Sequence, residues 1–244
     1  MAPVVLVALA VAPGIFWLWY FRLRDRMRPE PRALVARVFF LGAAAAFAAA
    51  LIEVGVFRTT GISLEGGKAP RILAAAAAIA LIEEVLKFFP VYFGIYRHVA
   101  FDEVMDGIVY AVAAALGFAT VENLAYVLQG GATVGILRAF LAVPGHAFFG
   151  AVMGFHMGLA KFAGRREVGW LITGVLLATL AHMLYDAFVF SRSYLAFAVI
   201  PFVVYLWRQA AAHAHRARAL DEGRVPMPDE DVTGPDDTNR PAPS

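Results

Sequence analysis

Residues 104–128 read VMDGIVYAVAAALGFATVENLAYVL, an apolar stretch in which Asp106 and Glu122 are the only charged side chains. About 20 consecutive apolar residues are enough for a helix to cross a membrane. The whole chain has the same character, because 61% of its 244 residues are hydrophobic and 16% are charged. Soluble domains have roughly 45–50% and about 25%. The sequence therefore predicts a polytopic membrane protein.

Seven stretches qualify, or nearly qualify, as membrane spans. They are roughly residues 3–21, 33–57, 72–96, 104–128, 136–160, 168–190 and 194–208. The first ends in bulky aromatic residues that suit a membrane interface, so we expect an anchor and not a cleaved signal peptide. We expect an all-α transmembrane bundle of about seven spans over residues 1–212, with a motif-bearing core at about 70–190. The polar region 213–244 is predicted to be a disordered cytoplasmic tail.

The basic residues predict the orientation. With the N-terminus outside, 15 of the 21 Lys and Arg residues fall in cytoplasmic segments and 5 in outer segments. Cytoplasmic loops carry an excess of Lys and Arg, so we expect the N-terminus outside and the C-terminus in the cytoplasm. Topology thus explains the basic loops, and no nucleic-acid motif is visible. The absence of Cys excludes disulfides, thiolate metal ligands and a cysteine nucleophile.

The third span contains three charged residues, where each charge costs at least about 2.5–3.5 kcal/mol. Glu83 and Lys87 are four residues apart and can pair along one helical face. Glu84 points about 100° away, so we expect the two carboxylates to have different environments. A structural ion pair with one spare carboxylate is the simpler alternative to a functional site.

The next two spans contain further polar residues. Glu122 and Asn123 follow one another in the fourth span, and an interhelical hydrogen bond is the structural alternative for Glu122. His146 lies in the fifth span at the head of a stripe of small residues, Gly150, Gly154 and Gly158. Such a stripe permits close helix packing, and His146 alone would be a packing residue.

The sixth span contains His182 and Asp186 on one helical face. A carboxylate beside an imidazole fixes its tautomer, as it does at metal-binding histidines, although a structural pair is the alternative. Glu122, His146 and His182 lie about 6, 10 and 8 residues from the outer ends of their spans, within one or two helical turns in depth. Glu83 lies somewhat deeper. The sequence thus predicts one Glu and two His at similar depth with a further Glu nearby.

Two His and one Glu with an open fourth position form a catalytic zinc arrangement, and a nearby Glu can take a proton from bound water. Other intramembrane protease chemistries fit less well. The four Ser residues fall in loops or the tail, the H-E-x-x-H motif is absent, and Asp186 has no membrane-embedded Asp partner because Asp106 lies near the opposite face. A metal-free glutamate mechanism, with the histidines stabilising an oxyanion, uses the same residues.

Four motifs in order resemble the PrsW family of bacterial intramembrane proteases and, more distantly, the CAAX prenyl endopeptidases. They are Glu83-Glu84-x-x-Lys87, Phe118-x-x-x-Glu122-Asn123, His146-x-x-x-Gly150 and His182-x-x-x-Asp186. The resemblance covers about residues 70–190. It implies a protease of the bacterial plasma membrane that cleaves a membrane-anchored, anti-sigma-factor-like protein near the outer face.

The resemblance also implies roles for the individual residues. Glu83 would be the general base, with Glu84 as its helper or structural partner. The metal, expected to be Zn²⁺, or the reacting water would be held by Glu122, His146 and His182. Supporting roles fall to Lys87, Asn123 and Asp186. The related prenyl endopeptidases have a His where this chain has Glu122.

Two other functional classes use the same residues differently. An ion-coupled transporter would use the buried carboxylates and histidines as a proton relay. A non-catalytic membrane scaffold would need only helix packing and would tolerate the loss of every polar residue named above. Neither class requires these residues at one depth.

Overall fold

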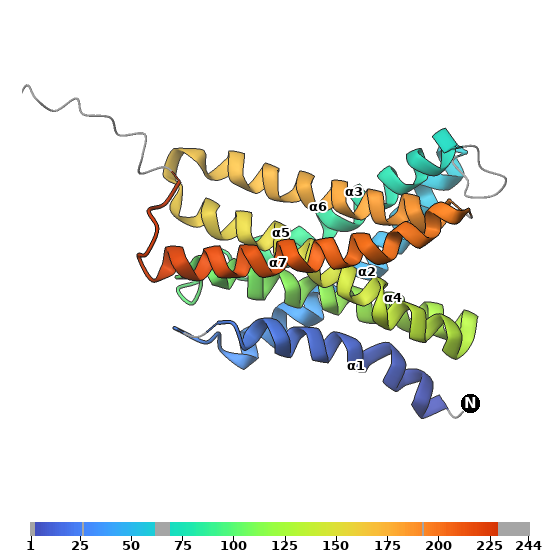
Figure 1. Ribbon diagram of the computed structural model, residues 1–244, viewed down its shortest axis with the longest axis horizontal. Helices are drawn as coiled ribbons and strands as arrows, with labels where there is room; N and C mark the ends of the chain where they lie inside the picture. The colour runs from blue at the N-terminus through green and yellow to red at the C-terminus, as the bar shows by residue number, and fades with distance from the viewer. Residues whose placement is uncertain (1–2, 26, 62–68, 192, 229–244) are drawn as a thin grey trace, which may run out of the picture.

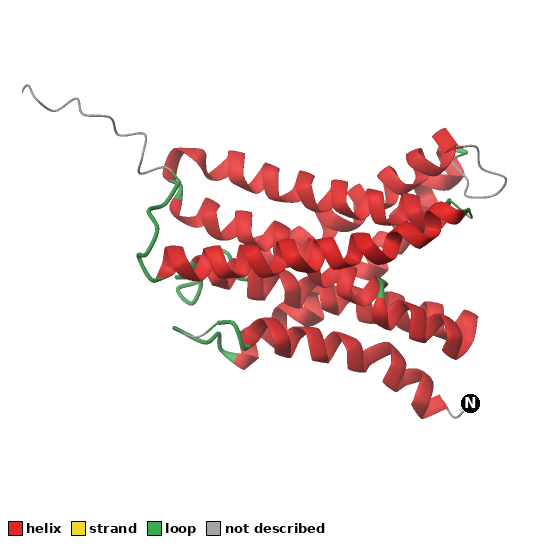
Figure 2. Ribbon diagram, in the orientation of Figure 1, coloured by secondary structure: helices red, strands yellow, loops and turns green. Residues whose placement is uncertain are grey.

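The computed structural model describes residues 3–25, 27–61, 69–191 and 193–228, and within these ranges the chain is helical and has no strands (Figures 1 and 2). The described part contains seven α-helices: α1 (Pro3–Arg22), α2 (Arg32–Thr60), α3 (Ala69–Gly94), α4 (Val104–Phe140), α5 (Ala142–Phe162), α6 (Glu167–Phe190) and α7 (Val199–Asp221). Short 3₁₀ helices, η1 (Gly164–Arg166) and η2 (Tyr194–Ala198), precede α6 and α7. The predicted all-α class is therefore confirmed.

Five helical stretches in the described part are long and apolar enough to cross a membrane. They are Val4–Arg22, Arg32–Thr60, Val104–Phe162, Gly164–Phe190 and Tyr194–Asp221, and the third of them contains both α4 and α5. Helix α3 is not among them, because it contains the charged residues Glu83, Glu84 and Lys87. The charges that suggest a site are the same charges that lower the apolar character of this helix.

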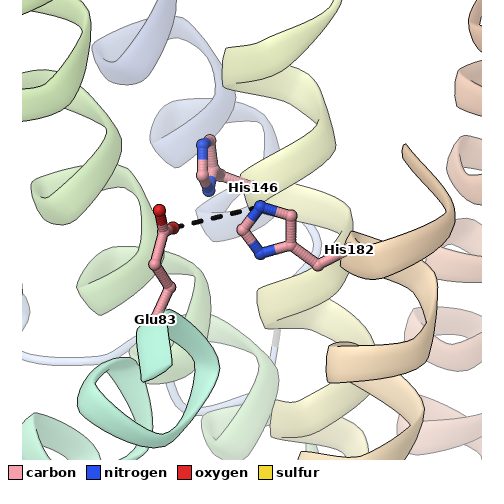
Figure 3. Close-up of side chains that lie close together, drawn as sticks. All are labelled: Glu83, His146 and His182. Atoms are coloured by element: carbon pink, nitrogen blue, oxygen red, sulfur yellow. Dashed lines mark ion pairs between the residues drawn. The ribbon is translucent and has the colours of Figure 1, made fainter. Parts of the chain in front are cut away.

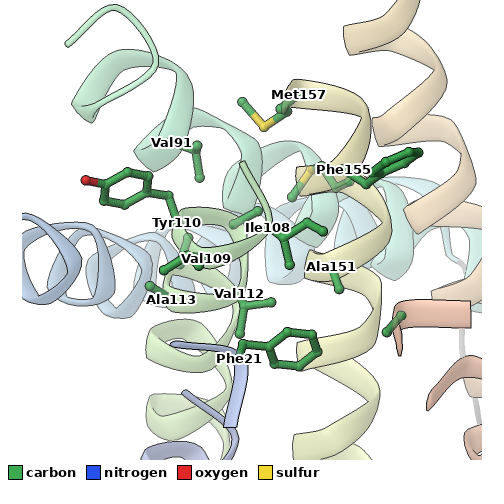
Figure 4. Close-up of a cluster of buried hydrophobic side chains, with 14 of the residues drawn as sticks. Phe21, Val91, Ile108, Val109, Tyr110, Val112, Ala113, Ala151, Phe155 and Met157 are labelled. Atoms are coloured by element: carbon green, nitrogen blue, oxygen red, sulfur yellow. The ribbon is translucent and has the colours of Figure 1, made fainter. Parts of the chain in front are cut away.

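Helices α4 and α5 form the centre of the bundle. Almost every side chain of α4 before Thr120 is buried, as is every residue of α5 from Ala142 to Ala160, and Figure 4 shows part of this apolar core. A Cβ atom added at Gly154 would overlap the backbone of Gly107, and one added at Gly158 would overlap the backbone of Val104. The predicted small-residue stripe on α5 therefore does permit close packing, and its partner is α4.

The outer faces of the surrounding helices are strongly apolar. Exposed large side chains include Phe40, Phe47 and Leu51 on α2 and Ile172 and Leu176 on α6. A water-soluble monomer rarely exposes a continuous surface of this kind. These faces are the ones expected to contact lipid.

Helix α4 is interrupted near its C-terminal end. Gly131 has φ 70° and ψ −163°, a conformation that residues with a Cβ atom rarely adopt. After this break the chain returns, so that Arg138 comes beside Asn123 of the preceding segment. The predicted span 136–160 begins within this returning segment, and α5 itself begins at Ala142.

The last helix is longer than predicted. The sequence predicts a span over residues 194–208 followed by disorder from residue 213, whereas α7 runs from Val199 to Asp221. Residues 213–221 are therefore helical, because Ala is the strongest helix former and Ala210, Ala214 and Ala217 are completely buried against the bundle. The remainder of the predicted tail beyond residue 228 lies outside the described residues.

Candidate active site

Helix α3 contributes a buried cluster of one ammonium and two carboxylate groups. Lys87 Nζ donates hydrogen bonds of 2.9 Å to Glu83 Oε2 and of 2.9 Å to Glu84 Oε1. Lys87 and Glu84 are completely buried, and Lys87 Nζ also lies 4.4 Å from the centre of the Phe118 ring. The expectation that Glu84 occupies a separate environment is thus wrong, because the long Lys87 side chain reaches both carboxylates.

His182 of α6 meets this cluster through Glu84. Its Nδ1 lies 2.9 Å from Glu84 Oε1, and since a carboxylate accepts, Nδ1 carries the proton. The other nitrogen, Nε2, lies 4.0 Å from Glu83 Oε2 and 3.7 Å from Asp186 Oδ2. The ring also stacks on Phe149 at 4.9 Å. Orientation of His182 therefore comes from Glu84 and Phe149, where the sequence predicts Asp186.

His146 of α5 lies between a cation and an anion. Its Nδ1 is 3.0 Å from Lys87 Nζ, so Nδ1 accepts. Its Nε2 lies 3.0 Å from the carboxylate oxygen Oε2 of Glu122. The His146 and His182 rings are 5.3 Å apart and nearly perpendicular. The two histidines predicted from separate spans are therefore neighbours in the folded chain.

Glu122 has a basic partner that the sequence reasoning missed. Arg138 Nη2 lies 3.0 Å from Glu122 Oε2, and Arg138 Nε donates a 2.9 Å hydrogen bond to Asn123 Oδ1. In the sequence, Arg138 is one of the five basic residues assigned to outer segments. The pair Gly130-Gly131 inside an apolar run is a turn signal that could have indicated this reversal of the chain.

Asn123 also connects the site to the first helix. Its Nδ2 donates hydrogen bonds of 3.2 Å to the backbone oxygens of Leu9 and Ala10 in α1. Asn123 is completely buried and does not approach the two histidines through any of these bonds. Its structural contribution is to fix α1 and Arg138 relative to α4.

A cavity of about 780 Å³ opens beside these groups. Its ionisable and other polar lining residues are Glu53, Glu83, Glu122, Tyr126, Gln129, Arg138, His146, His182, Tyr185 and Asp186, and most of the remaining wall is apolar. Glu84 and Lys87 do not line it; they lie behind Glu83. Glu53 also faces the cavity, and its buried Oε1 has no hydrogen-bond partner in the described part of the chain.

The residue types at the cavity wall suit a metal ion. One donor atom each from Glu83, His146 and His182 lies within 4.8 Å of the other two, and all three residues are buried (Figure 3). Two His and one carboxylate are the ligands of many catalytic zinc sites. The sequence groups the histidines with Glu122 instead. In the structure Glu122 lies on the far side of His146, beside Arg138.

A metal ion bound to this group would compete with Lys87 for the same donor atoms. The Lys87 ammonium already contacts two of the three residues, through Glu83 Oε2 and His146 Nδ1. A metal held by the same donors would therefore replace contacts that Lys87 makes. The Nδ1–H of His182 is directed to a carboxylate, which is the usual arrangement at a metal-binding histidine.

A helical membrane bundle with buried glutamate and histidine side chains at the wall of an internal cavity has the features of an intramembrane peptidase. The comparisons with known proteins agree. Residues 30–209 match the family described as PrsW family intramembrane metalloprotease, and the chain belongs to this family. The predicted resemblance is thus confirmed, and the protein is an intramembrane peptidase.

Several proteins named Protease PrsW are similar over most of their length. The one from Geobacillus kaustophilus is 37% identical over 213 residues, which cover 87% of this chain and 92% of the relative. The one from Bacillus subtilis is 35% identical over 221 residues, covering 90% and 99%. The one from Clostridioides difficile is 31% identical over 214 residues, covering 83% and 87%. No solved structure matches the chain significantly.

Proposed function

We propose that this chain hydrolyses a peptide bond of a membrane-anchored, anti-sigma-factor-like protein, near the outer face of a bacterial plasma membrane. The observation that carries the proposal is the convergence of Glu83, His146 and His182 at the wall of one cavity, within 4.8 Å of each other. A water molecule between these groups meets both a proton acceptor and two imidazole rings. Amide hydrolysis requires a proton acceptor and groups that position the attacking water.

Glu83 is the general base in this proposal. Only one of its oxygens, Oε2, is bonded to Lys87, so the other is available to accept a proton from water at the cavity wall. The resulting hydroxide attacks the substrate carbonyl carbon, and the Glu83 carboxyl group then donates its proton to the leaving amine. The unprotonated Nε2 atom of His182, 4.0 Å from Glu83 Oε2, accepts a hydrogen bond that holds the water, and the His146 ring lies beside it.

Four other residues position these three. Lys87 fixes the Glu83 carboxylate, and Glu84 fixes the ring of His182 through Nδ1. Glu122 faces the Nε2 atom of His146 and is itself held by Arg138. Each reacting side chain thus has a buried partner of opposite charge or complementary hydrogen bonding, which limits its movement.

Zn²⁺ would be held by His146, His182 and the Glu83 oxygen that otherwise contacts Lys87, and the other Glu83 oxygen would remain the proton acceptor. When bound, it lowers the pKa of a coordinated water toward about 7, so that hydroxide is available at neutral pH. The donor types support zinc, and the proximity of Glu83 to both histidines favours it over Glu122 as the carboxylate of this set.

The cavity also suits a substrate that arrives through the lipid. Phe47 of α2 and Val189 of α6 line it and are 64% and 42% exposed, so its rim is continuous with the apolar surface. A transmembrane segment can enter there sideways. It must unwind locally, because a helical peptide bond is hydrogen-bonded within its own helix.

The proposed topology has seven spans, with the N-terminus outside. In Figure 1 the N-terminus and the end of α7 lie at opposite ends of the bundle, as an odd number of crossings requires. The excess of basic residues in the loops at the α7 end supports a cytoplasmic location for that end. Helix α3 then crosses with its charges covered by α4, α5 and α6.

The test is cleavage by the purified chain reconstituted in liposomes with single-pass membrane proteins of anti-sigma-factor type, followed by mass spectrometry of the products. Replacing Glu83→Gln keeps an oxygen acceptor for Lys87 but removes the base, so we expect cleavage to fall by about 10²–10⁴-fold. Glu222→Gln, at an exposed position after α7, is the matched control and should cleave normally. Full activity of the Glu83 variant would overturn the assignment.

A further inference from the structure

A second group of carboxylates lies at the other end of α4, where α1 ends and α2 begins. Asp25, Glu30, Glu103 and Asp106 are 4%, 2%, 6% and 0% exposed. One carboxylate oxygen each from Asp25, Glu103 and Asp106 lies within 4.8 Å of the other two. Asp106 precedes Glu122 by 16 residues along α4, about 24 Å, so this acidic cluster is separate from the candidate active site.

The backbone fixes one edge of two of these carboxylates. Asp25 Oδ2 accepts a 2.9 Å hydrogen bond from the Glu30 amide. Asp106 Oδ2 accepts from the amides of Asp102 at 2.8 Å and Glu103 at 2.6 Å. The other oxygens, Asp25 Oδ1 and Asp106 Oδ1, are buried and accept no hydrogen bond from an N–H or hydroxyl donor in the described part of the chain. The backbone therefore fixes the orientation of the Asp25 and Asp106 carboxylates, and each has one buried oxygen without an N–H or O–H donor.

The carboxylates also face each other. Asp106 lies within hydrogen-bonding contact of the Glu30 carboxyl group, and Tyr110 donates its hydroxyl hydrogen to Glu30 Oε2. In Figure 4 the Tyr110 hydroxyl points away from the apolar core. Two ionised carboxylates cannot stay in contact unless a proton or a cation lies with them. The buried position therefore requires neutralisation by some positive charge.

The basic residues that contact this cluster lie at its solvent side. Arg28 forms a 2.5 Å ion pair with Asp102 and lies 3.9 Å from Glu103, but its side chain is 66% exposed. Arg22 donates to the backbone oxygen of Glu30 and not to its carboxylate. Burial raises the pKa of Asp25 and of Glu30, and it raises the pKa of Glu103 to about 7.

We propose that Asp25, Glu103 and Asp106 form a binding site for a hard divalent cation, Mg²⁺ or Ca²⁺. All the donors are carboxylate oxygens, which these cations prefer, and no His side chain is part of the group. The bound ion joins the loop after α1 to the start of α4. It thereby fastens the first helical hairpin to the central helix, independently of the proposed peptidase chemistry.

The test is thermal unfolding of the purified full-length chain in mild detergent, first in EDTA and then with Mg²⁺ or Ca²⁺ added. At ion concentrations about 100 times the Kd we expect Tm to rise by about 5–10 °C. Asp25→Asn and Glu103→Gln should lose this rise, since each removes a donor charge. Glu222→Gln is the control on the surface and His182→Ala the control in the candidate active site, and both should keep it.

Two results would overturn the proposal. One is a wild-type Tm that neither cation changes, and in that case acidification without any metal would identify protons as the neutralising charge. The other is an equal rise of Tm in the Asp25 and Glu103 variants, which would place the ion elsewhere.

A second measurement does not depend on the stability of Asp25→Asn. Tb³⁺, which replaces Ca²⁺ in oxygen sites, should emit when excited through Tyr110, because the Tyr110 hydroxyl is bonded to Glu30 of the cluster. We expect Ca²⁺ to compete for this emission and Glu103→Gln to weaken it by at least about 10-fold. Emission that survives unchanged in the variant would contradict the site.

Discussion

The two buried groups of carboxylates differ in the charges that accompany them. At the candidate active site, Glu83, Glu84 and Glu122 are accompanied by Lys87 and Arg138, each within 3.0 Å of a carboxylate. At the acidic cluster, the Arg side chain that forms ion pairs with Asp102 and Glu103, that of Arg28, is largely exposed. The first group has buried cations and lines a cavity, whereas in the described part of the chain the ion pairs beside the acidic cluster come from Arg28 at the surface.

This difference separates two uses of buried charge. Removing a carboxylate from water costs several kcal/mol unless a partner replaces the lost hydration. At the candidate active site, Lys87 and Arg138 replace the lost hydration of the carboxylates, so the site keeps its geometry without an added ion. At the acidic cluster the protein replaces the lost hydration only in part, and a proton or a cation from solution supplies the rest. The following predictions test that contrast.

The largest expected effect concerns zinc at the candidate active site. Purified wild-type chain should contain about one zinc per molecule, measured by mass spectrometry of the metal. His146→Ala and His182→Ala should lose it, because each contributes a donor. Glu122→Gln should retain it, because Glu122 lies outside the three-donor group. Loss of zinc in the Glu122 variant as well as in the two His variants would favour the ligand set predicted from the sequence.

Removing the central cation should break the charge balance of the site. In Lys87→Met, Glu83 and Glu84 lose their shared ammonium, and we expect a loss of about 3–5 kcal/mol in the free energy of unfolding. The double variant Lys87→Met with Glu84→Gln should recover part of this loss, because one unpaired charge is gone. Thermal unfolding in detergent measures both, and equal stability of the two variants would contradict the shared pairing.

The acidic cluster should make stability depend on pH in the opposite sense from an ordinary salt bridge. The folded pKa of Glu103 is about 7, above its usual 4.5, so the folded state binds this proton more tightly than the unfolded state does. Stability from Glu103 is therefore present below about pH 4.5 and is lost as pH rises toward 7.

In EDTA, we thus expect the Tm of the wild type to fall between pH 5 and pH 7.5. Glu103→Gln should reduce this fall by about 2–4 °C, the size of an effect of 1 kcal/mol in a chain of this length. If the variant and the wild type show the same dependence of Tm on pH, Glu103 is not the cause of that dependence.

The smallest effect is expected where neutral hydrogen bonds support the site. Asn123→Ala removes two bonds to the α1 backbone and the acceptor for Arg138, so we expect a loss of about 1–3 kcal/mol in stability. Because Asn123 does not contact either histidine, zinc content should stay unchanged. A loss of zinc in this variant would show that the position of α1 controls the metal donors.

The helices could be predicted from sequence because long apolar runs and costly charges are local properties. The same cost identified Glu83, Glu122, His146 and His182 as a group, and the structure brings them together. Their contacts could not be predicted, because these depend on the rotation of each helix about its axis. For this reason Asp186 was assigned to orient His182, whereas Glu84 does so.

Two features depend on folding over longer distances. The reversal at Gly131 brings Arg138 to Glu122, and a count of basic residues by span could not show this. The acidic cluster combines Asp25 from the loop after α1 with Glu103 and Asp106 at the start of α4. From the sequence alone, Asp106 is excluded as a partner of Asp186, because the two lie near opposite membrane faces, and its contacts with Asp25 and Glu103 cannot be predicted.

The composition of α3 has a consequence for how the protein is made. Its charged residues Glu83, Glu84 and Lys87 keep it out of the set of helices that could cross a membrane by apolar character alone. During synthesis α3 leaves the ribosome before α4, α5 and α6, whose side chains supply its partners. In the proposed seven-span topology, stable insertion of α3 would wait for α5 and α6, whose His146 and His182 contact Lys87 and Glu84, and would be completed in the step that forms the candidate active site.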